Sequence, residues 1–173
     1  MLCGELFKLK LGLYLFIFFP LWLGNALIWA VEPEKIYQKL NSLFFAENVA
    51  EVLKMWGNPV FEENGIPYWQ WEGGILCCIL EKGQAKVASY AETVDSIDMM
   101  DSKLLAKYRR LKKSFKSIFK MEGVEMEANW NVGNQPIKSI TTTWKKDNLQ
   151  FGWICSYNGQ FQNTTLQFIV RRQ

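Results

Sequence analysis

Three cysteines, Cys77, Cys78 and Cys155, are the side chains of this sequence best suited to covalent chemistry. A thiolate can attack a carbonyl group, ligate a metal or pair with a second thiol. Attack by cysteine needs a neighbouring base, and the 173 residues include no histidine, which also removes histidine-ligated zinc and the Ser-His-Asp triad. Since no base or fourth metal ligand accompanies the thiols, we expect a protein that is not an enzyme and holds no metal or cofactor.

A disulfide is the other chemistry open to these cysteines. Neighbours on a strand point to opposite faces, so only one of Cys77 and Cys78 could face Cys155. If both halves of the chain form one sheet, the corresponding strands lie about 14–19 Å apart, whereas a disulfide needs Cα atoms within about 7 Å. A possible Cys78–Cys155 disulfide and buried free thiols therefore remain alternatives.

The N-terminal segment has the pattern of an export signal. Leu11–Val31 has no charged residue over 21 positions, and Lys8 and Lys10 precede it. A basic start followed by an apolar run is typical of a secretory signal peptide, although this run is also long enough to span a bilayer as a helix. We expect residues 1–30 to be a cleaved signal peptide of a periplasmic or secreted protein, or else a single-pass N-terminal membrane anchor.

A strongly basic helix is predicted between Ser102 and Lys120, a stretch with eight basic residues and no acid. Apolar residues recur there at intervals of three and four, and Asp95, Asp98 and Asp101 precede it as candidate N-terminal caps. Such a helix could contact an anionic membrane surface or an acidic protein, but more often its cations are simply solvated. Nucleic acid is not expected as a partner. The candidate contact residues are Lys107, Arg109, Arg110, Lys112, Lys113 and Lys116.

Shorter elements are predicted upstream of the basic helix. Apolar spacing indicates two amphipathic helices, around residues 36–44 and 49–56, the second stopped by Gly57-Asn58-Pro59. After Pro67 the apolar pattern changes to period two, which predicts a meander of three strands with turns at Gly73-Gly74 and Lys82-Gly83.

Similar signals recur in the second half at offsets of 73 to 77 residues, pairing Trp71 with Trp144 and Cys78 with Cys155. We interpret the mature chain as an α+β protein of two tandem repeats, covering residues 31–92 and 93–173. Each repeat would contain a helix pair and an antiparallel meander of three or four strands, with the helices packed on a sheet, and EMEANWNV would be a weak helix of the second repeat. Two meanders that merely share common turn residues are the alternative.

Aromatic residues of the two meanders have two possible roles. Trp69 and Trp71 would share one face of a strand and Tyr68 the other, while Trp144 and Trp153 belong to the second meander. They could pack in a core beneath the helices. They could also form a contact surface for a protein partner, since tryptophan and tyrosine are enriched at binding hot spots.

The segment VAEVLKMWGNPV followed by GIPYWQWEGGILCCILEKGQAKV resembles the SmpA/OmlA domain of β-barrel assembly lipoproteins and the β-lactamase inhibitory protein family, which carries two such units in tandem. The resemblance covers about residues 34–173 and implies a binding fold without catalytic residues. We therefore expect an exported, non-enzymatic protein-binding module of the cell envelope, inhibitor-like or scaffold-like. The alternative is a membrane-anchored structural protein that contacts anionic lipid through its basic helix. The oligomeric state stays open.

Overall fold

The computed structural model describes residues 32–173, apart from residues 47 and 97–99. The predicted signal peptide or anchor therefore lies outside the described residues. Within the described part of the chain, no helix is both long enough and apolar enough to cross a membrane.

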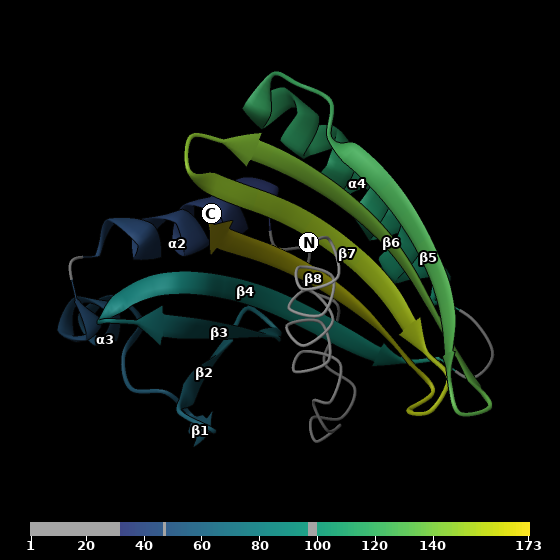
Figure 1. Cartoon of the computed structure of the whole chain (residues 1–173), viewed down its shortest axis with the longest axis horizontal. Helices are drawn as coiled ribbons and strands as arrows, with labels where there is room; N and C mark the ends of the chain where they lie inside the picture. The colour runs from purple at the N-terminus through teal and green to yellow at the C-terminus, as the bar shows by residue number, and fades with distance from the viewer. Residues whose placement is uncertain (1–31, 47, 97–99) are drawn as a thin grey trace, which may run out of the picture.

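The described chain folds into helices and antiparallel strands (Figure 1). The helices are α2 (Pro33–Phe45), α3 (Val49–Trp56) and α4 (Ser102–Phe119). The strands of the first half are β1 (Phe61–Glu63), β2 (Ile66–Trp71), β3 (Gly74–Glu81) and β4 (Gln84–Asp95). The strands of the second half are β5 (Val124–Val132), β6 (Gln135–Lys146), β7 (Leu149–Asn158) and β8 (Asn163–Arg172).

All of these strands form one eight-stranded sheet in the order β1-β2-β3-β4-β8-β7-β6-β5. The two halves meet where β4 pairs with β8, from Val87 opposite Arg171 to Asp95 opposite Asn163. The curved sheet in Figure 1 is continuous across this junction, and β1 and β5 are its two edges.

The predicted tandem arrangement of helix pairs and meanders is wrong. Helices α2 and α3 precede the strands of the first half, but α4 is the helix of the second half and has no pair in the described chain. The segment EMEANWNV, expected to be a weak helix, belongs to β5. Polar and apolar residues alternate strictly along it, and that period of two favours a strand over a helix.

Other predicted elements are confirmed. The three amphipathic helices lie where apolar spacing placed them, and β2, β3 and β4 form the expected meander. The first turn falls one residue earlier than predicted, at Glu72-Gly73, where φ is 49° and 78°. Positive φ at both central residues is the geometry of a two-residue hairpin turn that suits the twist of the sheet.

A row of directly paired residues crosses the sheet and defines its helix-covered face. The row runs through Trp69, Leu76, Tyr90, Phe168, Trp153, Thr142 and Glu125. Helix α4 packs on this face through Phe115, whose ring centroid lies 4.8 Å from that of Phe168 and 5.5 Å from that of Trp153. Tyr37 of α2 contacts the same Phe115 ring, so both helices cover one core.

The predicted aromatic contact surface is wrong for the tryptophans in this core. Trp69, Trp144 and Trp153 are only 4%, 2% and 0% exposed. Trp71 is half-buried and packs edge-to-face on Tyr90. Tyr68 points to the opposite face, as expected, but it is also buried. The buried side chains of this set hold the fold together and are not available to a partner, whereas Trp71 keeps part of its surface exposed.

The possible disulfide between Cys78 and Cys155 is also wrong. Cys77, Cys78 and Cys155 are free and buried. Strands β4 and β8 separate β3 from β7, which puts the two strands about 14 Å apart. Burial raises the pKa of Cys77 to about 11 and those of Cys78 and Cys155 to about 12, so none is a ready nucleophile at neutral pH.

Candidate binding groove between α4 and β5

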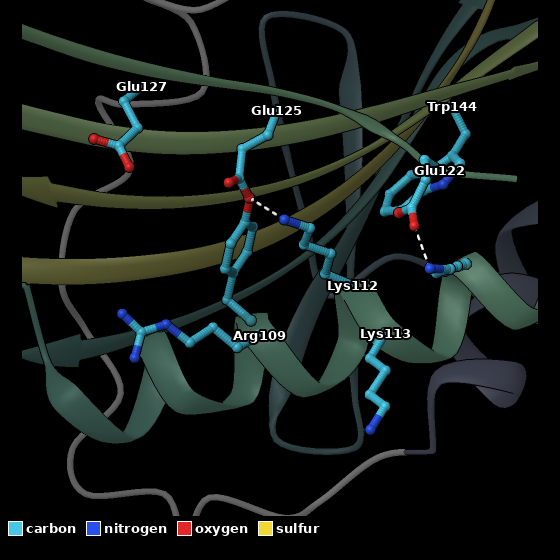
Figure 2. A pocket seen from close by; sticks show the side chains of 9 residues that line it. Arg109, Lys112, Lys113, Glu122, Glu125, Glu127 and Trp144 are labelled. Carbon is cyan, nitrogen blue, oxygen red and sulfur yellow. Dashed lines mark hydrogen bonds and ion pairs between the residues drawn. The ribbon is translucent and has the colours of Figure 1, made fainter.

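A groove of about 390 Å³ separates α4 from edge strand β5 (Figure 2). Helix α4 supplies one wall with mostly basic side chains, and β5 with the segment before it supplies acidic ones. The groove is lined by Tyr108, Arg109, Lys112, Lys113, Lys116, Glu122, Glu125, Glu127 and Trp144.

An N-terminal cap and a buried stripe fix the position of α4. The carboxylate of Asp101 accepts hydrogen bonds from the backbone N–H groups of Lys103 and Leu104, at 2.9 and 2.8 Å, which confirms the predicted cap. Asp95 lies at the end of β4 instead, and Asp98 lies outside the described residues. The buried stripe consists of Leu104, Lys107, Tyr108, Leu111 and Phe115, and it turns the remaining cations of α4 outward.

Strand β5 directs its carboxylates toward α4. Glu125 is opposite Thr142 in the sheet and belongs to the row on the helix-covered face, and Glu127 follows it at the next position on that face. Figure 2 shows both side chains above the helix. The alternation along β5 therefore places acids on the groove side and apolar residues on the other side.

A hydrogen-bonded network ties the two walls together at the floor of the groove. Oε2 of Glu125 accepts hydrogen bonds from Nζ of Lys112 at 2.7 Å, from the hydroxyl of Tyr108 at 3.1 Å and from that of Thr142 at 3.2 Å. The two hydroxyls also lie 2.6 Å apart, within hydrogen-bond distance. Tyr108 and Thr142 are buried, so the network gives the groove a rigid base.

The surroundings of Glu125 and Tyr108 in this network shift the pKa values of both side chains. The hydrogen bond from Lys112 is the largest cause that lowers the pKa of Glu125, which keeps this carboxylate ionised at neutral pH. Burial raises the pKa of Tyr108, so its hydroxyl remains protonated and able to donate. The groove therefore has a fixed ion pair in its wall and a neutral hydroxyl in its floor.

The connection between α4 and β5 forms one end of the groove, where Glu122 lines it. Lys116 forms an ion pair with Glu122, and the indole N–H of Trp144 donates to the carbonyl oxygen of Met121 at 3.3 Å. Gly123 follows, where a Cβ would lie 2.4 Å from Cγ2 of Thr142 and 2.6 Å from the indole of Trp144. Only glycine lets the backbone pass so close to these two side chains.

The six cations predicted as a contact surface have different environments. Lys107 is buried and forms an ion pair with Glu92, at 2.5 Å, so its prediction as a contact residue is wrong. Lys112 and Lys116 are held by the acids of the groove. The exposed side chains of Arg109, Arg110 and Lys113 form no ion pair with another described side chain, and Arg109 and Lys113 line the groove.

Sequence reasoning missed the acidic wall. Glu122, Glu125 and Glu127 are near α4 in sequence, but the helical interpretation of residues 125–132 concealed their common direction. The alternation of polar and apolar residues in that segment was the signal that could have found them. Within the described residues, no group of three or more acidic residues or cysteines is arranged so that it could hold a metal ion.

Comparison with known proteins leaves the family of this chain open. No family model matches the chain, and neither a curated protein nor a solved structure gives a significant match.

Proposed function

We propose that this chain is a non-enzymatic protein-binding module of the cell envelope, and that its partner inserts an acidic segment into the groove between α4 and β5. The observation that carries this proposal is the pair of exposed cations, Arg109 and Lys113, on the groove wall without a described acidic partner. The export pattern of Leu11–Val31 supports the location, and the resemblance to SmpA/OmlA and β-lactamase inhibitory proteins supports the class.

Charge and rigidity suit the groove to an acidic segment. Arg109 and Lys113 are one helical turn apart, so both can reach one extended acidic segment. Lys112 is already held by Glu125, which is itself held by the floor hydroxyls, and this removes part of the ordering cost of binding. The carboxylates of β5 would repel a segment that carried its acids on the wrong side, which gives the groove a preferred orientation.

A protein partner fits this geometry better than a lipid bilayer does. The apolar stripe of α4 is buried against the sheet, so the helix cannot insert it among acyl chains. Contact with headgroups would then depend on the exposed cations alone, and the acids Glu122 and Glu127 in the same groove oppose an anionic plane. The membrane-anchored alternative therefore becomes an outcome of the experiment below.

Binding of a fluorescent oligo-glutamate peptide to the purified full chain, followed by fluorescence anisotropy, tests the proposal. We expect saturable binding that weakens with salt, because exposed charges are screened beyond about 10 Å at 0.1 M ionic strength. The double variant Arg109→Gln/Lys113→Gln should raise the Kd by at least about tenfold. Lys54→Gln/Lys82→Gln removes two exposed cations outside the groove and is the matched control.

Equal losses in the two double variants would reject the groove as the site, since only net charge would then matter. Binding of oligo-lysine in preference to oligo-glutamate would reject the acidic partner. Sedimentation with phosphatidylglycerol vesicles that depends on Arg109 and Lys113, without peptide binding, would favour the lipid-contacting alternative.

A further inference from the structure

Strand β5 is an open edge of the sheet whose only charged side chains are two carboxylates, Glu125 and Glu127, on its groove side. It has nine residues, most of them exposed, and its pairing with β6 runs without interruption from Val124 to Val132. Natural sheets commonly guard their edges with short strands, charged side chains (lysine above all), proline or bulges. The opposite edge, β1, has only three residues, whereas β5 has neither lysine nor proline and displays Val124 and Met126 at 65% and 58% exposure.

The sequence of β5, VEMEANWNV, is self-complementary about its central residue, Ala128. Apolar side chains occupy the even positions and polar ones the odd positions, so the two kinds lie on opposite faces of the strand. The acids Glu125 and Glu127 precede the centre, and the amides Asn129 and Asn131 follow it at the same distances. An antiparallel copy would therefore set amide donors against carboxylate acceptors.

We propose that two copies of this chain pair through their β5 edges, antiparallel and centred on Ala128, to form one sheet that continues across a two-fold axis. A two-fold axis requires the same surface of both copies, which a self-complementary strand supplies. The directly opposed residues would be Val124 with Val132, Glu125 with Asn131, Met126 with Trp130, Glu127 with Asn129, and Ala128 with itself.

Charge selects this register over its neighbours. If the pairing were centred on Glu127 instead of Ala128, Glu127 of one copy would lie opposite Glu127 of the other. Like charges directly opposed destabilise a sheet. A shift the other way would leave Val124 and Glu125 without partners in β5. Parallel pairing in register would oppose every glutamate to itself. The centre at Ala128 pairs all nine residues and opposes no two carboxylates.

Pairing would also cover the exposed apolar side of the edge. Met126 would lie beside the half-buried Trp130 of the second copy, and the thioether and indole suit each other in such contacts. On the other side, the amides of the second copy would lie beside Glu125 and Glu127 and extend the groove. This inference concerns the free edge of β5 and stands independently of the acidic partner proposed for the groove.

Sedimentation equilibrium of the purified full chain tests the pairing, in a nonionic detergent that keeps Leu11–Val31 from driving association. We expect a reversible monomer–dimer equilibrium. Ala128→Lys, at an exposed position, would oppose two cations at the axis and raise the dimer dissociation constant by at least about tenfold. Val60→Lys is the matched control, at an apolar residue that is 61% exposed and lies outside β5, and should leave the equilibrium unchanged.

A charge exchange tests the register itself. Asn129→Glu alone would set carboxylates against Glu127 of the second copy and weaken the dimer. Adding Glu127→Lys would set opposite charges at the same positions and restore it. Far-UV circular dichroism would verify that each variant folds.

The proposal is overturned by a monomer at concentrations where a Kd of about 100 µM would be visible, or by a dimer that tolerates Ala128→Lys. A dimer weakened by Asn129→Glu and not restored by the double variant would overturn the register centred on Ala128.

Discussion

Lys107 and Glu92 form a buried ion pair in the layer between α4 and β4. Nζ of Lys107 lies 2.5 and 2.6 Å from the two carboxylate oxygens, and the hydroxyl of Tyr90 donates to Oε1 at 2.7 Å. The two charged side chains are only 6% and 9% exposed. Each charge is therefore compensated by the other rather than by water. The loss of either would leave the other charge buried and unpaired.

We expect Lys107→Met to lower the free energy of unfolding by about 3–5 kcal/mol, because it leaves a buried carboxylate without its cation. The double variant Lys107→Met/Glu92→Gln removes both charges and should return to within about 1 kcal/mol of the wild type. Urea denaturation followed by circular dichroism measures both. Equal destabilisation of the two variants would mean that packing at Lys107, and not charge compensation, dominates.

Because of the buried thiols, we expect the free energy of unfolding to decrease at alkaline pH. Their ordinary pKa of 9.0 is raised to about 11 for Cys77 and about 12 for Cys78 and Cys155, mainly by burial. Above pH 9 the unfolded chain therefore holds fewer protons on these thiols than the folded chain. We expect full stability from this source below pH 9 and a progressive loss as the pH rises toward 11–12, measurable as a falling urea midpoint.

Replacement of the three cysteines by alanine should flatten this alkaline decline, although burial of Tyr68 and Tyr108 also raises their pKa values and will leave a residual slope. An unchanged decline in the triple variant would contradict the assignment to the thiols.

At the scale of an element, α4 depends on Asp101 for its start. We expect Asp101→Ala to destabilise the protein by about 1 kcal/mol, because the N–H groups of Lys103 and Leu104 lose their side-chain acceptor. Thermal unfolding measures the effect, and Ser102→Ala, at an exposed neighbouring position, is the control. Equal effects of the two substitutions would argue against capping as the cause.

Elements with one strong local signal could be predicted, and the others could not. The apolar stripe of α4 and the glycine turns of β2–β4 depend on neighbouring residues, so local spacing located the helix and placed each turn to within one residue. The direction of Glu125 depends on a strand whose partner is elsewhere in the chain, and its short alternating pattern was taken for a weak helix. Burial of Lys107 depends on Glu92, 15 residues away and on another element. Such pairings follow from tertiary contacts.

At the scale of the whole molecule, the β4·β8 junction decides how the chain unfolds. Nine consecutive residue pairs join the halves there, and the core beneath α2 and α4 includes residues of both. We expect one cooperative transition in urea, although residues 31–92 and 93–173 were predicted as separate repeats. Hydrogen-exchange mass spectrometry should show β3 and β7 losing protection at the same urea concentration. Earlier loss in β3 would indicate two separate units.

The β4·β8 junction also determines when the central part of the sheet can form during synthesis of the chain. Val87 pairs with Arg171, which is 84 positions later in the sequence. Strand β4 therefore gains its second neighbouring strand only after β8 has been synthesised. Contacts between residues so distant in sequence close slowly, because the entropy of a long loop is lost before any contact is gained. In a nascent chain that ends after β4, one edge of β4 therefore has no partner strand, and the core cannot be completed. The core is therefore completed only after β8, the last strand of the sheet in sequence, has been synthesised.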